Sequence, residues 1–67
     1  MTVAIKVQQT IASAESVMAN LKSFALETQD QNAKTMFQSL TQSQQTIVDS
    51  LNARLQYIQS QEPQYNQ

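Results

Sequence analysis

The sequence predicts an all-α protein, an antiparallel two-helix hairpin that dimerises into a four-helix bundle. Two rows of apolar residues recur at spacings of three and four, which is the pattern of one face of a helix. Five polar residues, 28–32, separate the two rows and indicate a turn. The chain has 67 residues and neither Cys nor His, so no disulfide or zinc site can stabilise its small core. Self-association is the common route that remains.

The first helix is expected from about residue 3 to residue 27. Thr2 can act as its N-cap, because a hydroxyl there accepts a hydrogen bond from a free backbone N–H of the first turn. A second set of residues recurs every seventh position and widens the apolar face. The main row is Ala4, Val7, Ile11, Ala14, Met18, Leu21 and Ala25, and the set beside it is Val3, Thr10, Val17 and Phe24.

The second helix is expected from about residue 31 to residue 60. Asp30 is its expected N-cap, and a capping box of Thr28 with Gln31 is the alternative. Pro63 cannot continue a helix, so residues 62–67, which include Tyr65, are expected to form a flexible tail. The apolar row of this helix is Ala33, Phe37, Leu40, Gln44, Ile47, Leu51, Leu55 and Ile58, interrupted only by Gln44.

These elements make a single domain of residues 1–61, with a turn at about 28–31. The chain has no Gly, so a residue other than Gly must end the first helix. One long continuous helix is the alternative architecture. The hairpin is favoured because the segment between the rows is wholly polar and the two halves match in length.

The width of the apolar rows predicts a homodimer, since one hairpin cannot cover faces this broad. Gln44 has two interpretations: a buried amide that fixes the register or the oligomeric state, or a side chain that reaches solvent. The residues expected at the oligomer interface are Val17, Phe24, Gln44, Val48 and Leu55.

The composition argues against catalysis and against nucleic-acid binding. With no His or Cys, the chain lacks the usual general base, the thiol nucleophile and most metal ligands, and with no Gly it lacks a phosphate-binding loop. We therefore expect no enzyme activity, no catalytic, cofactor or metal residues, no cofactor and no small-molecule substrate. The net charge is −1 and the four basic residues are scattered, so no nucleic-acid partner is expected either. No apolar run exceeds three residues, and a cytoplasmic location is expected.

Three segments resemble one small family. They are residues 24–34 followed by Phe37, residues 47–54, and the ending Glu62-Pro63-Gln64-Tyr65. Together they are similar to domain of unknown function 1657, from spore-forming Firmicutes, over essentially the whole chain. The resemblance implies a small helical protein without known enzymatic activity, with genes near sporulation operons that include membrane-protein genes. It implies a role in the forespore or spore, as an accessory to a membrane assembly, and it offers no catalytic residues.

The leading hypothesis is therefore a non-enzymatic structural or interaction protein that self-associates and acts during sporulation. The alternative is an adaptor subunit whose apolar face binds a larger protein, such as a spore membrane protein. Nucleic-acid binding is a third hypothesis, and the charge of the chain argues strongly against it.

Overall fold

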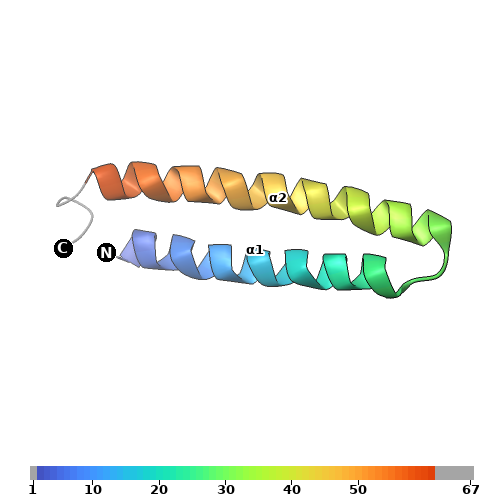
Figure 1. The fold of residues 1–67 in the computed structure, drawn as a ribbon. Helices are drawn as coiled ribbons and strands as arrows, with labels where there is room; N and C mark the ends of the chain where they lie inside the picture. Colours follow the sequence, from blue (N-terminus) through green and yellow to red (C-terminus); the bar gives the residue numbers. More distant parts are fainter. Residues whose placement is uncertain (1, 62–67) are drawn as a thin grey trace.

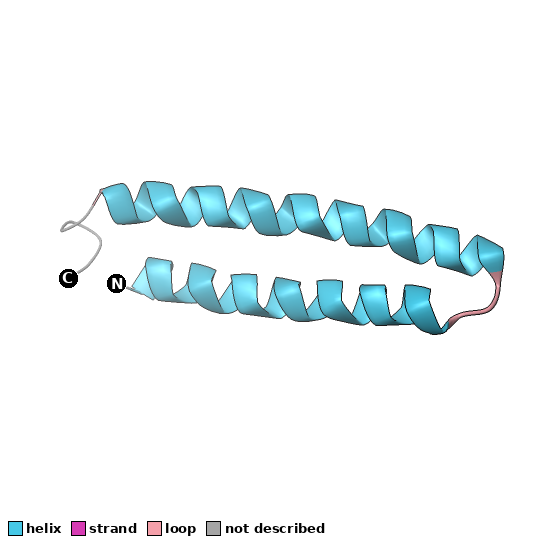
Figure 2. Cartoon of the chain, viewed as in Figure 1, coloured by secondary structure: helices cyan, strands magenta, loops and turns pink. Residues whose placement is uncertain are grey.

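The computed structural model describes residues 2–61, which form two α-helices lying side by side and antiparallel (Figure 1). Helix α1 spans Thr2–Glu27 and helix α2 spans Gln31–Ser60. Figure 2 shows the one short loop that joins them, and the part of the chain described contains no strand. The expected helical hairpin is thus confirmed and a single continuous helix is wrong, because the chain reverses between the two helices. The tail predicted at 62–67 lies outside the described residues.

The turn is closed by side chains of the polar segment itself. The backbone N–H of Thr28 donates to the carbonyl of Phe24 at 3.0 Å, and the Thr28 hydroxyl oxygen accepts from the backbone N–H of Asp30 at 3.3 Å. The Asp30 carboxylate accepts from the backbone N–H of Ala33 at 3.0 Å, which caps α2. Asp30 is therefore the N-cap, as expected.

The capping-box alternative does not form. The amide of Gln31 donates to the hydroxyl of Thr35, 3.4 Å away, rather than turning back to the residues before α2. Asp30 has φ −82° and ψ 119°, an extended conformation that does not require Gly. A sequence without Gly can therefore enter α2 without backbone strain.

The core lies along the line where the two helices meet, and it is thin. None of its side chains is completely buried in the described part of the chain. Half of the buried hydrophobic residues are alanines, which let the helix backbones approach but bury little apolar area. The buried residues are Ala4, Ile11, Ala14, Ala25, Val48 and Ile58. A core of this size supplies little net stability to a small domain.

The row of α2 that faces α1 differs from the expected one at two positions. Thr41 and Val48 lie in the row, where Leu40 and Ile47 were expected, and Leu40 and Ile47 are 43% and 49% exposed. The observed row keeps an unbroken alternation of four and three residues, as does the row of α1, so the two stay in register along the hairpin. The expected row broke that alternation near Leu51. The observed row is Phe37, Thr41, Gln44, Val48, Leu51, Leu55 and Ile58.

Thr41 can occupy this row because its polar group is already satisfied. Its hydroxyl donates to the carbonyl of Phe37, one turn earlier in the same helix, at 2.8 Å. The same bond within the helix is made by Thr10 to Lys6 and by Thr46 to Gln42. A threonine in a half-buried position therefore costs this helix little in unpaired polar groups.

Candidate interaction surface

Nine large hydrophobic side chains are exposed in the described part of the chain, and six of them, with exposed fractions between 43% and 52%, lie on one side of the hairpin. Both helices contribute. Phe24 on α1 and Met36 on α2 lie at similar distances from the turn, and so do Val17 and Leu40. We call this set the apolar face: Val3, Val17 and Phe24 of α1, and Met36, Leu40 and Ile47 of α2. A soluble monomer rarely exposes a contiguous apolar patch of this kind without using it.

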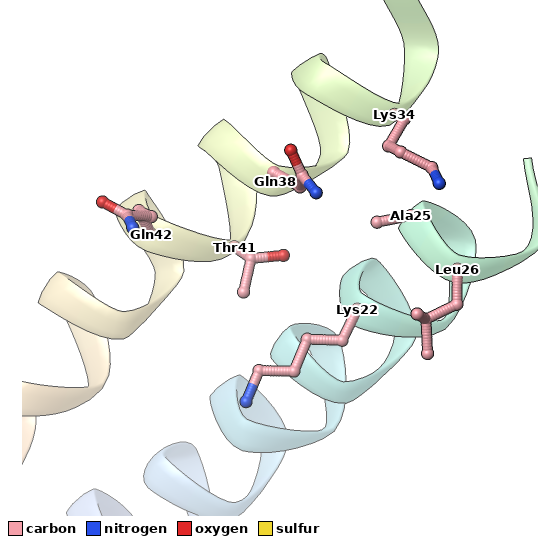
Figure 3. A pocket seen from close by; sticks show the side chains of 7 residues that line it. All are labelled: Lys22, Ala25, Leu26, Lys34, Gln38, Thr41 and Gln42. Carbon is pink, nitrogen blue, oxygen red and sulfur yellow. The ribbon is translucent and has the colours of Figure 1, made fainter. Parts of the chain in front are cut away.

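An open groove on the other side of the hairpin shows that these six residues share one face. The groove is lined by Lys22 and Leu26 of α1 and by Lys34, Gln38 and Gln42 of α2, so those five residues point to the same side (Figure 3). Residues two apart on a helix are about 200° apart around its axis.

Each of these groove residues has an apolar-face residue opposite to it. Phe24 therefore points away from the groove, because it is two residues from Lys22. The same holds for Leu40, which is two residues from Gln38, and for Met36, which is two residues from Lys34. Val17 and Val3 precede Phe24 by seven and twenty-one residues, and Ile47 follows Leu40 by seven, so they lie on the same side.

An aromatic pair ties the apolar face to the core near the turn. The ring of Phe24, on α1, lies 5.4 Å from the ring of Phe37, on α2, with a tilt of 54° between the ring planes. Tilted pairs at this separation add about 0.5–1.5 kcal/mol to the area they bury. Phe24 still keeps 47% of its surface exposed, so the pair holds that side chain in place and leaves one side of it open.

Gln44 makes the one side-chain hydrogen bond found between the two helices of residues 2–61. Its side-chain amide donates to the backbone carbonyl of Ala14, 2.9 Å away on α1, and the residue is half-buried. The bond fixes the position of α2 along α1 at this level. Of the two interpretations of Gln44, the structure shows the residue inside the row, acting on the register of the hairpin itself.

Comparison with known proteins decides the family. Residues 7–55, about three-quarters of the chain, match the model of the family described as Protein of unknown function (DUF1657). The chain belongs to this family. The resemblance noted from the sequence is thereby confirmed at the level of the family. No curated protein and no solved structure matches the chain.

In the structure of this DUF1657 protein, the five residues predicted at the oligomer interface lie in two different places. Val17 and Phe24 lie on the apolar face, each 47% exposed. Gln44, Val48 and Leu55 lie in the row that faces α1, where Val48 is only 3% exposed and the other two are half-buried. Val48 therefore belongs to the core of one hairpin and has almost no surface left for a second chain.

The residues that the sequence reasoning missed as surface candidates are Met36, Leu40 and Ile47. Leu40 and Ile47 were expected in the row that faces α1, because each lies three or four residues from its neighbours in that row. The signal that distinguishes the two sets is the regular spacing of the row that runs through Thr41 and Val48. In α2, spacing decided which residues face α1, and hydrophobicity alone did not.

Metal-ligating side chains do not cluster in the described part of the chain. Within residues 2–61 there is no group of three or more His, Cys, Asp or Glu side chains that could hold a metal ion. Neither α1 nor α2 has the length of apolar sequence needed to cross a membrane. Two features of the described chain are candidates for recognising another molecule: the apolar face and the groove opposite to it.

Proposed function

We propose that this protein is a non-enzymatic structural or interaction protein that self-associates through the apolar face into a four-helix bundle and acts in the forespore or spore. Two observations together support self-association: the apolar face has six exposed large side chains, and the core of the single hairpin has no completely buried side chain among the described residues. Covering a half-exposed side chain of this size is worth about 1 kcal/mol. Association with a second hairpin gains this free energy at each residue of the apolar face that it covers.

A second copy of the chain fits the apolar face better when both turns lie at the same end of the bundle. In that arrangement α1 of one hairpin lies over α2 of the other. Phe24 and Met36 are five and seven residues from the centre of the turn at residue 29, and Val17 and Leu40 are twelve and eleven. At 1.5 Å per residue, Phe24 meets Met36 of the partner subunit and Val17 meets Leu40 of the partner subunit. At these two levels, near the turn, apolar groups therefore meet apolar groups.

In the alternative, end-for-end arrangement, the two turns lie at opposite ends of the bundle, and the two surfaces match less well. It would lay α2 against α2 of the partner subunit in the opposite direction, which brings Met36 toward Arg54 and Leu40 toward Ser50. In the same-end dimer Met36 and Leu40 meet apolar side chains instead, and the polar contacts, such as Thr10 with Ile47 of the partner subunit and Arg54 with Val3 of the partner subunit, lie farther from the turn. Both arrangements are two-fold symmetric and use the same face of each subunit, so the match of side chains near the turn favours the same-end dimer.

The absence of enzyme activity is proposed from the residue types of the chain. It contains neither His nor Cys, and no Gly for a phosphate-binding loop.

The role in the forespore or spore is proposed from the family resemblance, and the proposed location is the cytoplasm of that cell. Antibody detection of the protein through growth and spore formation tests this role. We expect the protein to accumulate only after spore formation begins, and constant amounts in growing cells with none in spores would overturn it.

Self-association is tested by two matched variants whose molecular mass is measured by size-exclusion chromatography with light scattering. Leu40→Glu places a charge in the centre of the apolar face, and Leu26→Glu makes the same change on the opposite side, where Leu26 is 83% exposed. We expect the native chain and Leu26→Glu to be dimers and Leu40→Glu to be a monomer, because the charge would be buried unpaired.

Two results would contradict the proposed dimer. A native chain that is a cooperatively melting monomer at all concentrations would remove it altogether. A monomeric native chain whose helix content rises sharply on addition of a larger partner protein would support the adaptor function in its place.

A further inference from the structure

The groove opposite to the apolar face has the size of a ligand-binding site. Its volume is about 550 Å³, within the range of about 300–1,000 Å³ that is usual for such sites. It lies near the turn, between α1 and α2, and Figure 3 shows its side chains gathered from both helices. Its lining is Lys22, Ala25, Leu26, Lys34, Gln38, Thr41 and Gln42.

The hollow exists because small residues stand where the helices approach each other. Ala25 is buried and has no atom beyond Cβ, so α1 leaves space beneath the side chains of α2. The hydroxyl of Thr41 donates its hydrogen to the carbonyl of Phe37, so it cannot also donate a hydrogen bond to a ligand. The floor of the groove therefore favours apolar groups.

The rim of the groove is positively charged. Lys22 and Lys34 are two of the four basic residues of the chain, and no Asp or Glu is among the lining residues. Gln38 and Gln42 add side-chain amides that can donate hydrogen bonds to an acidic group. Beside them, Leu26 is 83% exposed, the largest exposed fraction of the large hydrophobic side chains described. The groove thus combines two cations with an apolar surface.

We propose that this groove binds an acidic peptide segment of a partner protein, with carboxylates on Lys22 and Lys34 and an aliphatic side chain against Ala25 and Leu26. Charge complementarity decides for this occupant over a membrane surface. Two lysines are fewer than the cluster of about four to eight basic residues that typically binds an anionic bilayer, whereas they match two carboxylates of a peptide. The inference does not rest on self-association, because the groove lies on the other side of the hairpin.

The test uses random peptides displayed on phage and selected on the immobilised full chain. The peptide most enriched is then synthesised with a fluorescent label, and its binding is measured by fluorescence anisotropy. We expect it to contain Asp or Glu next to a Leu, Ile or Val. Lys22→Glu and Lys34→Glu should each weaken its binding about ten- to a hundredfold, the effect of losing a hydrogen bond between charged groups.

Lys6→Glu is the matched control, because it makes the same change of charge on an exposed residue of α1 outside the groove. We expect it to leave peptide binding within about twofold, since an exposed charge several turns away is screened by salt. Circular dichroism checks that all three variants remain helical.

Three results would overturn the proposal. Selection could enrich peptides without acidic residues. The three lysine variants could weaken binding equally, which would show a general effect of charge. Finally, the chain could ignore the peptides and sediment with phosphatidylglycerol vesicles in a manner lost in Lys22→Glu, which would assign the lysines to a lipid surface.

Discussion

At the scale of single residues, two polar side chains do most to define the hairpin. Asp30 caps α2 and Gln44 bonds across to α1, each through one hydrogen bond to the backbone. The effects differ, because the cap determines where the helix begins and the crossing bond determines how far α2 can slide along α1. A heptad row by itself allows slippage by whole turns, and a single polar contact in the row distinguishes one register from the others.

The contribution of Gln44 can be measured against its neighbour Gln45. Gln44→Ala should lower the free energy of unfolding by about 1 kcal/mol, because it removes the amide that the carbonyl of Ala14 accepts from. Gln45→Ala removes only an exposed hydrogen bond to Asp49 within α2, worth about 0.2–0.5 kcal/mol. Urea unfolding followed by circular dichroism measures both. Equal losses would show that the bond to α1 contributes nothing specific.

At the scale of the helices, α1 and α2 contribute differently to their contact. The buried residues of α1 include Ala4, Ala14 and Ala25, so α1 offers a narrow surface to its neighbour. Helix α2 fills the row with larger side chains such as Phe37, Leu51 and Leu55. Small residues on one helix facing large ones on the other allow close packing, and they also leave the groove beside Ala25.

The need for a small residue on α1 is tested by two alanines that lie close together in sequence. Ala14→Leu should destabilise the hairpin by about 1–3 kcal/mol, because Ala14 is 7% exposed and a larger side chain would push the helices apart. Ala12→Leu makes the same change at an exposed position and should alter stability by less than about 0.5 kcal/mol. Thermal melting of both variants gives the comparison. A neutral Ala14→Leu would mean that the helices can separate without cost at this level.

At the scale of the whole molecule, the hairpin has two faces of different chemistry. One carries the six exposed apolar side chains and the other carries the groove with its two lysines. In the proposed same-end dimer the apolar faces are enclosed, and both grooves remain outside, near the same end of the bundle. Such a dimer could bind two acidic segments of one partner, and the second would bind at a high effective concentration.

The orientation of the subunits in the dimer is tested by chemical cross-linking of introduced cysteines. The native chain has no Cys, so only the introduced thiols react. In the same-end dimer Thr10 lies level with Ile47 of the partner subunit, nineteen and eighteen residues from the turn. A mixture of Thr10→Cys and Ile47→Cys chains should therefore form a mixed dimer with a short bismaleimide linker. Chains of one variant alone should cross-link poorly. Efficient cross-linking of each variant with itself would indicate the end-for-end orientation instead.

The sequence by itself determined the elements of this protein and their limits. The apolar periodicity predicted both helices, and the polar segment predicted the turn, because these are local properties of the chain. Asp30 could be identified as a cap for the same reason: its hydrogen bond reaches only as far as Ala33. The family could also be identified, since the match covers most of the chain.

The tertiary structure decided which apolar residues are shared between the helices and which are left over. Leu40 and Thr41 are neighbours on α2, and each lies three or four residues from Phe37 and from Gln44, so the spacing at this point does not distinguish them; only the alternation along the whole row favours Thr41. The choice depends on how α2 is rotated against α1, which is fixed by contacts distant in sequence, such as the bond of Gln44 to Ala14 and the contact of Phe24 with Phe37. The rotation that buries Val48 exposes Leu40 and Ile47, and it thereby creates the apolar face.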